Sequence, residues 1–195
     1  MSWDKYVDAN GVLRNLLAIT DANRLSEAEA DFTRRRIREL EAHPVQGEFD
    51  LAHLQAIHRH IAQDLASWAG ELRDVDIAKQ HMFCPVVNLR SYADEIFRRL
   101  AIRKHLRGLS REEFISQLTS FYGDVNALHP FREFNGRTQR VFFGQLAHNA
   151  NWHIAWNRLN PEENISASIA SFRGVESPMR AMFDRLVDPY PPKRL

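Results

Sequence analysis

Apolar residues recur at steps of three and four positions along most of the chain, which is the spacing that gathers them on one face of an α-helix. Polar and charged side chains fill the intervening positions, so each helix is expected to bury one side only. This pattern predicts helices in residues 28–40, 51–65, 89–106, 111–128 and 138–150, with further helix starts at Pro161 and Pro178.

Capping signals mark several of these helix starts. Ser26 with Glu29, and Ser110 with Glu113, each have the spacing of a capping box, in which side chains and backbone amides bond reciprocally. Asp50 is a suitable N-cap for the helix that follows it. The chain is therefore predicted to be an all-α helical bundle.

One segment departs from the helical pattern. Between residues 72 and 87, Val75 and Ile77 alternate with polar residues, a polar tip follows at residues 79–81, and apolar residues then return. This arrangement predicts one small β-hairpin, and Pro85 would restrict its second half to an edge strand.

The two ends of the chain differ from its middle. Residues 1–10 are polar with scattered aromatics and are expected to form an arm that docks on a later segment. Residues 189–195 contain three prolines and are expected to form a tail or linker. We therefore expect a single domain over residues 1–188, which leaves open that the chain is a fragment of a longer protein.

Composition narrows the class of protein. The chain has 195 residues and a formal charge of +1, and a near-balance of charge argues against direct nucleic-acid binding. It has one cysteine, Cys84, so no intramolecular disulfide can form and a cytoplasmic setting is expected. No run of apolar residues is long enough to cross a membrane, so no membrane partner is expected.

Residues 129–140, HPFREFNGRTQR, combine features of a phosphate site. Asn135 and Gly136 allow a turn that directs backbone N–H groups inward, at the start of a helix whose N-terminus favours anions. Arg137 and Arg140 lie three apart and so project from one face. Glu133 is the segment's only carboxylate, placed where Mg²⁺ beside a polyphosphate would bind.

His129 adds a possible base to this segment. An imidazole has an unperturbed pKa near neutrality and can take a proton from an attacking hydroxyl. These residues together indicate transfer of a nucleotide phosphate. The alternative is that they form a surface cluster joined by weak ion pairs.

The same segment resembles the central motif of Fic domain proteins, H-x-F-x-[D/E]-G-N-G-R-x-x-R. Residues 51–77 are similar to a second family block that ends in W-A-G-x-x-R, and the resemblance extends from about Gly11 to Leu186. The motif matches at His129, Phe131, Glu133, Asn135, Gly136, Arg137 and Arg140.

The resemblance implies a Fic-type helical bundle that transfers AMP from ATP to a Ser, Thr or Tyr hydroxyl of a target protein. His129 is then the general base, and Glu133 holds Mg²⁺ between the α- and β-phosphates. The nucleotide is the co-substrate and Mg²⁺ the cofactor.

The nucleotide-binding residues follow by the same resemblance. Asn135 and the backbone through Phe134 and Gly136 cradle the phosphates. Arg137 holds the β-phosphate and Arg140 pairs with the γ-phosphate.

The expected hairpin corresponds to the family's flap. Lys79 and Gln80 near its tip are expected to touch the nucleotide. The flap's edge is expected to register the target segment by main-chain pairing.

Phe134 is a departure, because the family has glycine there. If the position requires a positive φ, a bulky residue costs about 1–3 kcal/mol of strain. If the backbone is ordinary, the ring only reshapes the pocket wall. The alternative function is therefore a catalytically impaired nucleotide- or partner-binding protein.

Many Fic proteins carry an inhibitory helix with the motif [S/T]-x-x-x-E-[G/N]. Here only Glu163–Asn164 supplies the last two residues, and Leu159 stands where Ser or Thr is needed. The resemblance implies a separate small antitoxin whose glutamate contacts Arg140. It also implies, through similar bacterial toxins, that DNA gyrase and topoisomerase IV subunits are the targets.

Overall fold

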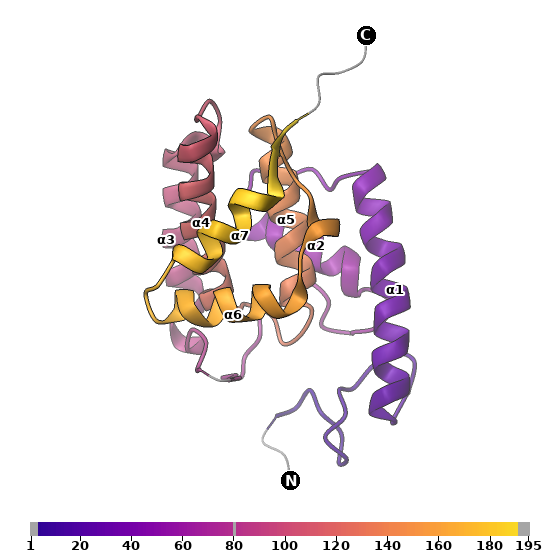
Figure 1. The fold of residues 1–195 in the computed structure, drawn as a ribbon. Coiled ribbons are helices and arrows are strands. Elements are labelled where there is room, and N and C mark those ends of the chain that lie inside the picture. The colour runs from indigo at the N-terminus through magenta and orange to yellow at the C-terminus, as the bar shows by residue number, and fades with distance from the viewer. Residues whose placement is uncertain (1–3, 80, 191–195) are drawn as a thin grey trace.

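Helix α5 (Asn135–Asn149) lies in the middle of the helical bundle, where it packs against α2 and α4 (Figure 1). The computed structural model describes residues 4–79 and 81–190, and within them seven α-helices and one two-stranded sheet confirm the predicted all-α class. The remaining elements are α1 (Ala22–Ala42), α2 (Leu51–Ala62), α3 (Leu89–Ile102), α4 (Arg111–Leu128), α6 (Pro161–Phe172), α7 (Ser177–Leu186), β1 (Trp152–Ile154), β2 (Val187–Pro189) and the 3₁₀ turns η1 (Val86–Asn88), η2 (Lys104–Leu106) and η3 (Trp156–Arg158).

The capping predictions had different outcomes. The Asp50 carboxylate accepts from the His53 N–H, and Ser110 forms the expected capping box with Glu113. The Ser26 prediction is wrong, because Asp21 caps α1 by accepting from the Arg24 N–H, and Ser26 lies inside the helix.

The expected hairpin at residues 72–87 is reduced to one antiparallel bridge, between Ala78 and Met82. The Phe83 N–H still donates across the loop to the Ile77 carbonyl, at 3.2 Å, but the backbone from Cys84 onward bonds to other parts of the molecule. The Cys84 N–H donates to the Ala127 carbonyl at the end of α4, and the Cys84 carbonyl accepts from Arg73. The segment is a bridged loop fixed at its base, and Gln80 at its tip lies outside the described residues.

The regular sheet forms elsewhere. Strand β1 pairs with β2 antiparallel, with His153 opposite Asp188. Pro189 is thus part of the fold, and the Tyr190 ring packs on His148 with ring centroids 4.3 Å apart. The folded part extends beyond the expected boundary at residue 188, and residues 191–195 lie outside the described residues.

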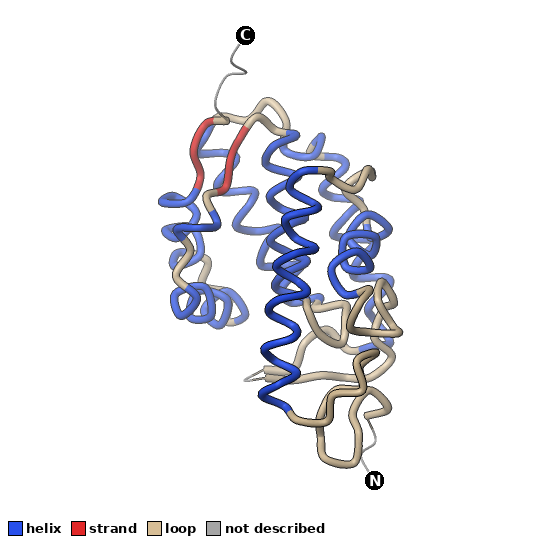
Figure 2. The backbone as a smooth tube through the Cα atoms, turned by 90° about the vertical axis from the view of Figure 1, so that its right-hand side faces the viewer, coloured by secondary structure: helices blue, strands red, loops and turns tan. Residues whose placement is uncertain are grey.

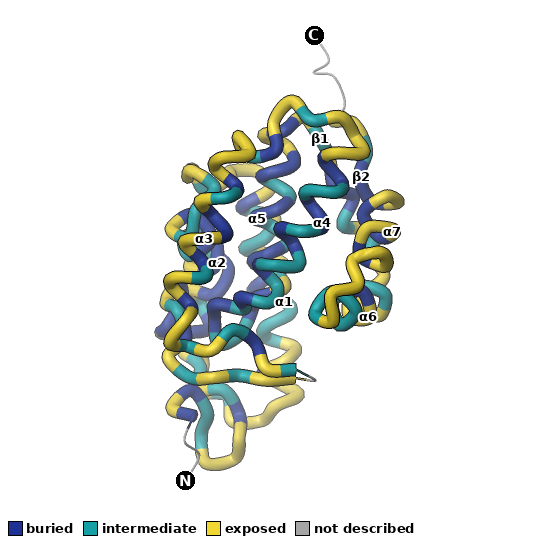
Figure 3. Tube along the Cα trace, turned by 90° about the vertical axis from the view of Figure 1, so that its left-hand side faces the viewer, coloured by how far each residue is buried: buried dark blue, intermediate teal, exposed yellow. Residues whose placement is uncertain are grey.

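Two apolar clusters hold the bundle together. The larger lies among α2, α3, α4, α5 and α7. Figure 3 shows buried residues alternating with exposed residues along the helices, as expected when each helix buries one side. The smaller, called here the Trp68 cluster, consists of Tyr6, Ala62, Leu65, Ala66, Trp68 and Phe134.

The N-terminal arm contributes to the Trp68 cluster, as expected of a docking segment. The Tyr6 ring meets Trp68 edge to face, with centroids 5.5 Å apart, and Asp4 pairs with Arg132 at 2.7 Å. The arm lies at the opposite end of the molecule from the β-strands (Figure 2). None of the helices in the described part of the chain has the length and apolar composition needed to cross a bilayer.

Candidate active site

A sharp turn joins α4 to α5 and places His129 at its start. His129 is the C-cap of α4 with a left-handed backbone (φ 44°, ψ 61°), and its N–H donates to the Val125 carbonyl at 3.1 Å. Pro130 follows and prevents the helix from continuing. The chain therefore turns away from α4 while the His129 side chain stays at its end.

The His129 ring is fixed on two sides. Nδ1 lies 3.3 Å from the Asn126 carbonyl, and the ring stacks on Phe83 with centroids 3.8 Å apart and an interplanar angle of 12°. If Nδ1 carries the proton for that hydrogen bond, Nε2 keeps its lone pair. Burial chiefly, with the positive charge of Lys79 next, lowers the pKa of His129 to about 3, so the ring is neutral at physiological pH.

Arg73 ties the turn to the flap. Its buried guanidinium donates from Nε to the His129 carbonyl at 2.9 Å, from Nη1 to the Val75 carbonyl at 2.9 Å, and from Nη2 to the Cys84 carbonyl. Its own N–H donates to the Pro130 carbonyl at 2.9 Å. One side chain thus holds both ends of the flap segment and the backbone beneath His129.

His58 supports the turn from below. Its Nδ1 accepts from the Gly70 N–H at 2.8 Å, so Nε2 carries the proton and donates to the Glu133 carbonyl at 3.2 Å. The ring stacks on Phe131, with centroids 3.8 Å apart. Burial lowers the pKa of His58 to about 4, which keeps this neutral tautomer.

Asn135 closes the turn. Its Oδ1 accepts from the Phe131 N–H at 2.9 Å, and its Nδ2 donates to the Phe131 carbonyl at 2.7 Å. Both ends of the amide are therefore used within the turn. Asn135 therefore fixes the shape of the turn that leads into α5.

The start of α5 offers backbone donors. The first helical hydrogen bond of α5 runs from Thr138 N–H to the Phe134 carbonyl, so the N–H groups of residues 135–137 precede the helical ladder. The first turn contains no acidic residue. Helix N-termini of this kind attract anions.

A cavity of about 230 Å³ lies over this helix start. It brings together His129, Glu133, Asn135, Gly136 and Lys79, as expected from the sequence. The other lining residues were not predicted from the sequence; they come from the flap, the end of α4 and one face of α6: His81, Phe83, Asn126, Asn164, Ile165, Ser168, Ile169 and Phe172. The α6 residues among them recur at steps of three and four, and this spacing in the sequence could have indicated that they share one face of a helix.

Arg137 and Arg140 line a second cavity, of about 340 Å³, on the α1 side of α5. Gly136 lines the His129 cavity and the next residue, Arg137, lines this one, so the two cavities adjoin the same first turn of α5. An Arg137 Nη1 atom lies 4.0 Å from a carboxylate oxygen of Glu29 on α1. Within residues 4–79 and 81–190, Arg140 makes no ion pair.

Phe134 has a left-handed backbone, with φ 61° and ψ 9°. Of the two alternatives considered for a bulky residue in place of glycine, this is the strained one. The residue is 4% exposed, its side chain packs in the Trp68 cluster, and it lines neither cavity. The alternative of an ordinary backbone, with a ring that only reshapes the pocket wall, therefore does not apply. Strain of about 1–3 kcal/mol is offset by burial of a Phe side chain, about 1.5–3 kcal/mol.

The site fits a magnesium ion only together with phosphate. Glu133 is the one carboxylate among the described residues that line the His129 cavity. No group of three His, Cys, Asp or Glu residues in the described part of the chain could hold a metal by itself. Mg²⁺ is commonly bound by one or two carboxylates plus substrate phosphates, so this donor set suits a metal that arrives with a nucleotide.

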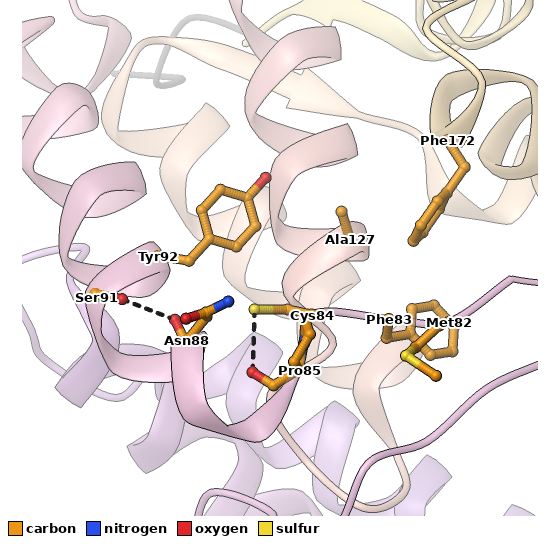
Figure 4. Close-up of a pocket in the computed structure, with 9 residues that line it drawn as sticks. All are labelled: Met82, Phe83, Cys84, Pro85, Asn88, Ser91, Tyr92, Ala127 and Phe172. Atoms are coloured by element: carbon orange, nitrogen blue, oxygen red, sulfur yellow. Dashed lines mark hydrogen bonds between the residues drawn. The ribbon is translucent and has the colours of Figure 1, made fainter.

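An apolar groove of about 540 Å³ runs beside the flap (Figure 4). Phe83 and Phe172 line both this groove and the His129 cavity. Met82 projects beside them and is 62% exposed. A chain lying in the groove would therefore reach the edge of the His129 cavity.

Comparison with known proteins agrees with this geometry. The model of the Fic/DOC family matches residues 48–147. Protein adenylyltransferase VbhT of Bartonella schoenbuchensis is 43% identical over 93% of this chain, which spans 38% of the length of VbhT. Probable protein adenylyltransferase y4lH of Sinorhizobium fredii is 39% identical, covering 90% of this chain and 91% of that relative.

A solved structure extends the comparison to three dimensions. It is the N-terminal Fic domain of a VirB-translocated Bep effector protein from Bartonella quintana, with bound ADP. Its TM-score is 0.89 at 27% identity, over 95% of each chain.

Proposed function

The chain belongs to the Fic/DOC family, and we propose that it transfers AMP from ATP to a Ser, Thr or Tyr hydroxyl of a protein, with release of pyrophosphate. Its enzyme class is that of a nucleotidyltransferase, because close relatives over most of its length are protein adenylyltransferases. The observation that carries the proposal is one cavity that holds both the neutral His129 and the free amides of α5.

The residues have distinct tasks in this reaction. His129 Nε2 takes the proton of the target hydroxyl as its oxygen bonds to the α-phosphorus. The bond from that phosphorus to the bridging oxygen breaks, and its electron pair leaves on pyrophosphate. The α5 amides stabilise the negative charge on the phosphates, with Arg137 at the β-phosphate and Arg140 at the γ-phosphate.

Glu133 would hold Mg²⁺ against the α- and β-phosphates, and the ion would supply further positive charge there. Lys79 of the flap lines the same cavity and adds a cation at its rim. On α6, Ile165 is 57% exposed and provides apolar surface for the adenine ring of ATP.

The target segment is proposed to dock along the flap and the groove beside it. The flap has one bridge among its described residues, which leaves backbone groups for main-chain pairing with a target strand. By family resemblance, the target would be a subunit of DNA gyrase or topoisomerase IV.

A small antitoxin is the proposed regulator. Its inhibitory glutamate would pair with Arg140, which lines an open cavity and makes no ion pair within the described residues. Adding such a protein should suppress transfer. Replacing its motif glutamate by glycine should restore transfer while the complex persists, whereas continued inhibition would contradict the Arg140 contact.

The competing proposal of a catalytically impaired binding protein depends on Phe134. Its ring points into the Trp68 cluster and leaves the His129 cavity open, which favours the enzyme.

The test uses ATP labelled on either the α- or the γ-phosphate, with Mg²⁺ and gyrase or topoisomerase IV subunits. Label from the α-position should appear on a protein, and label from the γ-position should not. Label from the γ-position alone would indicate a kinase, and label from neither would favour the binding protein.

A further inference from the structure

The Arg137 side chain lies against an aromatic ring and near a carboxylate. Its guanidinium carbon lies 5.4 Å from the centre of the Phe134 ring, within the range of a cation–π contact. One of its nitrogen atoms lies 4.0 Å from the Glu29 carboxylate. The side chain is 31% exposed, so the contact with the ring is partly shielded from water.

The Phe134 ring is held firmly enough to act as a platform. It stacks on Trp68 with centroids 6.1 Å apart and an interplanar angle of 20°, and it lies 6.2 Å from His58. Its backbone is the N-cap of α5, three residues before Arg137. Ring and guanidinium therefore move together with the start of the helix.

We propose that Phe134 is a positioning residue, whose ring holds the Arg137 guanidinium in the orientation that binds the β-phosphate of the nucleotide. This inference rests on the proposed function and deepens it. Glycine at this position would relieve the left-handed strain but would offer no surface to Arg137. Phenylalanine at this position strains the backbone, but it fixes the orientation of the Arg137 side chain before the nucleotide binds.

A role in core packing alone makes a different prediction. Phe134→Leu keeps an apolar side chain in the Trp68 cluster but removes the π face, whereas Phe134→Tyr keeps the face. Comparing the affinities for ADP and AMP isolates the contact with the β-phosphate, because AMP lacks that group.

Titration calorimetry of ADP and AMP tests the proposal. Phe134→Leu should weaken ADP binding by about threefold to tenfold and leave AMP binding within about twofold. Phe134→Tyr should bind both nucleotides like the wild type. In Arg137→Ala, adding Phe134→Leu should weaken ADP no further, because the two act through one contact.

Leu65→Ala is the matched control, since Leu65 packs in the same cluster and is 2% exposed. It should lower the melting temperature without changing the ratio of ADP to AMP affinity. An unchanged ratio in Phe134→Leu would overturn the proposal, and so would additive losses in the double variant. Failure of the proposed function would look different, because the wild type would then not transfer label from α-labelled ATP to a protein, whatever the ratio of its ADP and AMP affinities.

Discussion

At the residue scale, the site depends on two left-handed residues at the two ends of one short turn. His129 ends α4 and Phe134 begins α5, with φ 44° and 61°. Neither is glycine, so both conformations are held by what surrounds them: Arg73 and Phe83 at His129, and the Trp68 cluster at Phe134.

The sequence could identify the chemistry-bearing residues, because their types and spacing are local. It could not show where the Phe134 ring points. That direction depends on Tyr6 and Trp68, which are far away in the chain. The same limit applies to Asn135, whose amide is used within the turn.

The lowered pKa of His129 has a consequence for the pH dependence of transfer. Burial and the positive charge of Lys79 favour the neutral ring, which remains the competent base well below its ordinary pKa of 6.5. The acid limb of kcat/KM assigned to His129 should therefore lie far below pH 6.5. Lys79→Met should move it upward. A wild-type limb near 6.5, unmoved in the variant, would contradict this assignment.

At the element scale, the helices followed from periodicity, whereas the flap and the sheet did not. Residues 72–87 have strand-like alternation and pair at Ala78 and Met82, with the Phe83 N–H donating to the Ile77 carbonyl. Cys84, however, bonds to Arg73 and to the end of α4, so the pairing does not extend into a regular hairpin. Strands β1 and β2 are three residues each and pair across more than thirty residues of sequence, so no local pattern indicates them.

The flap's attachment through Arg73 predicts an effect of a conservative change. Arg73→Lys keeps the charge, but its donors sit on one nitrogen and cannot reach the separate carbonyls of His129, Val75 and Cys84 that Nε, Nη1 and Nη2 of the guanidinium meet. Buried carbonyls left without donors should lower the free energy of unfolding by about 2–3 kcal/mol, measured by urea denaturation. Transfer activity should fall as well.

Arg59→Lys on the exposed side of α2 is the control and should change stability by less than about 0.5 kcal/mol. Equal stability of the two variants would show that Arg73 does not hold the flap.

At the scale of the whole molecule, α5 is the shared wall of two cavities, and the N-terminal arm reaches the turn through Arg132. Two histidines, the buried His58 and the partly buried His129, have pKa values lowered to about 4 and about 3, chiefly by desolvation. Protonation of these two histidines should therefore affect both the stability of the fold and the state of the active site.

Stability should consequently fall in mild acid. Below about pH 6.5 the unfolded chain takes up protons on these histidines and the native state does not, so the free energy of unfolding decreases as pH falls. From pH 6.5 to about pH 5, each histidine contributes a loss of about 1.5 kcal/mol. Urea denaturation at several pH values in this range should show that the free energy of unfolding depends less steeply on pH in His58→Gln than in the wild type.

His43 is exposed at the end of α1, so His43→Gln serves as the control and should keep the wild-type slope. If His58→Gln kept it too, His58 would not be a buried neutral group.

The central claim is that His129 performs proton removal at a nucleotide site formed by the start of α5. It is tested most directly by comparing wild type with His129→Ala for AMP transfer and for ATP binding. We expect transfer to fall by about 10²–10⁴-fold while the dissociation constant for ATP changes little. Undiminished transfer by His129→Ala would contradict the account.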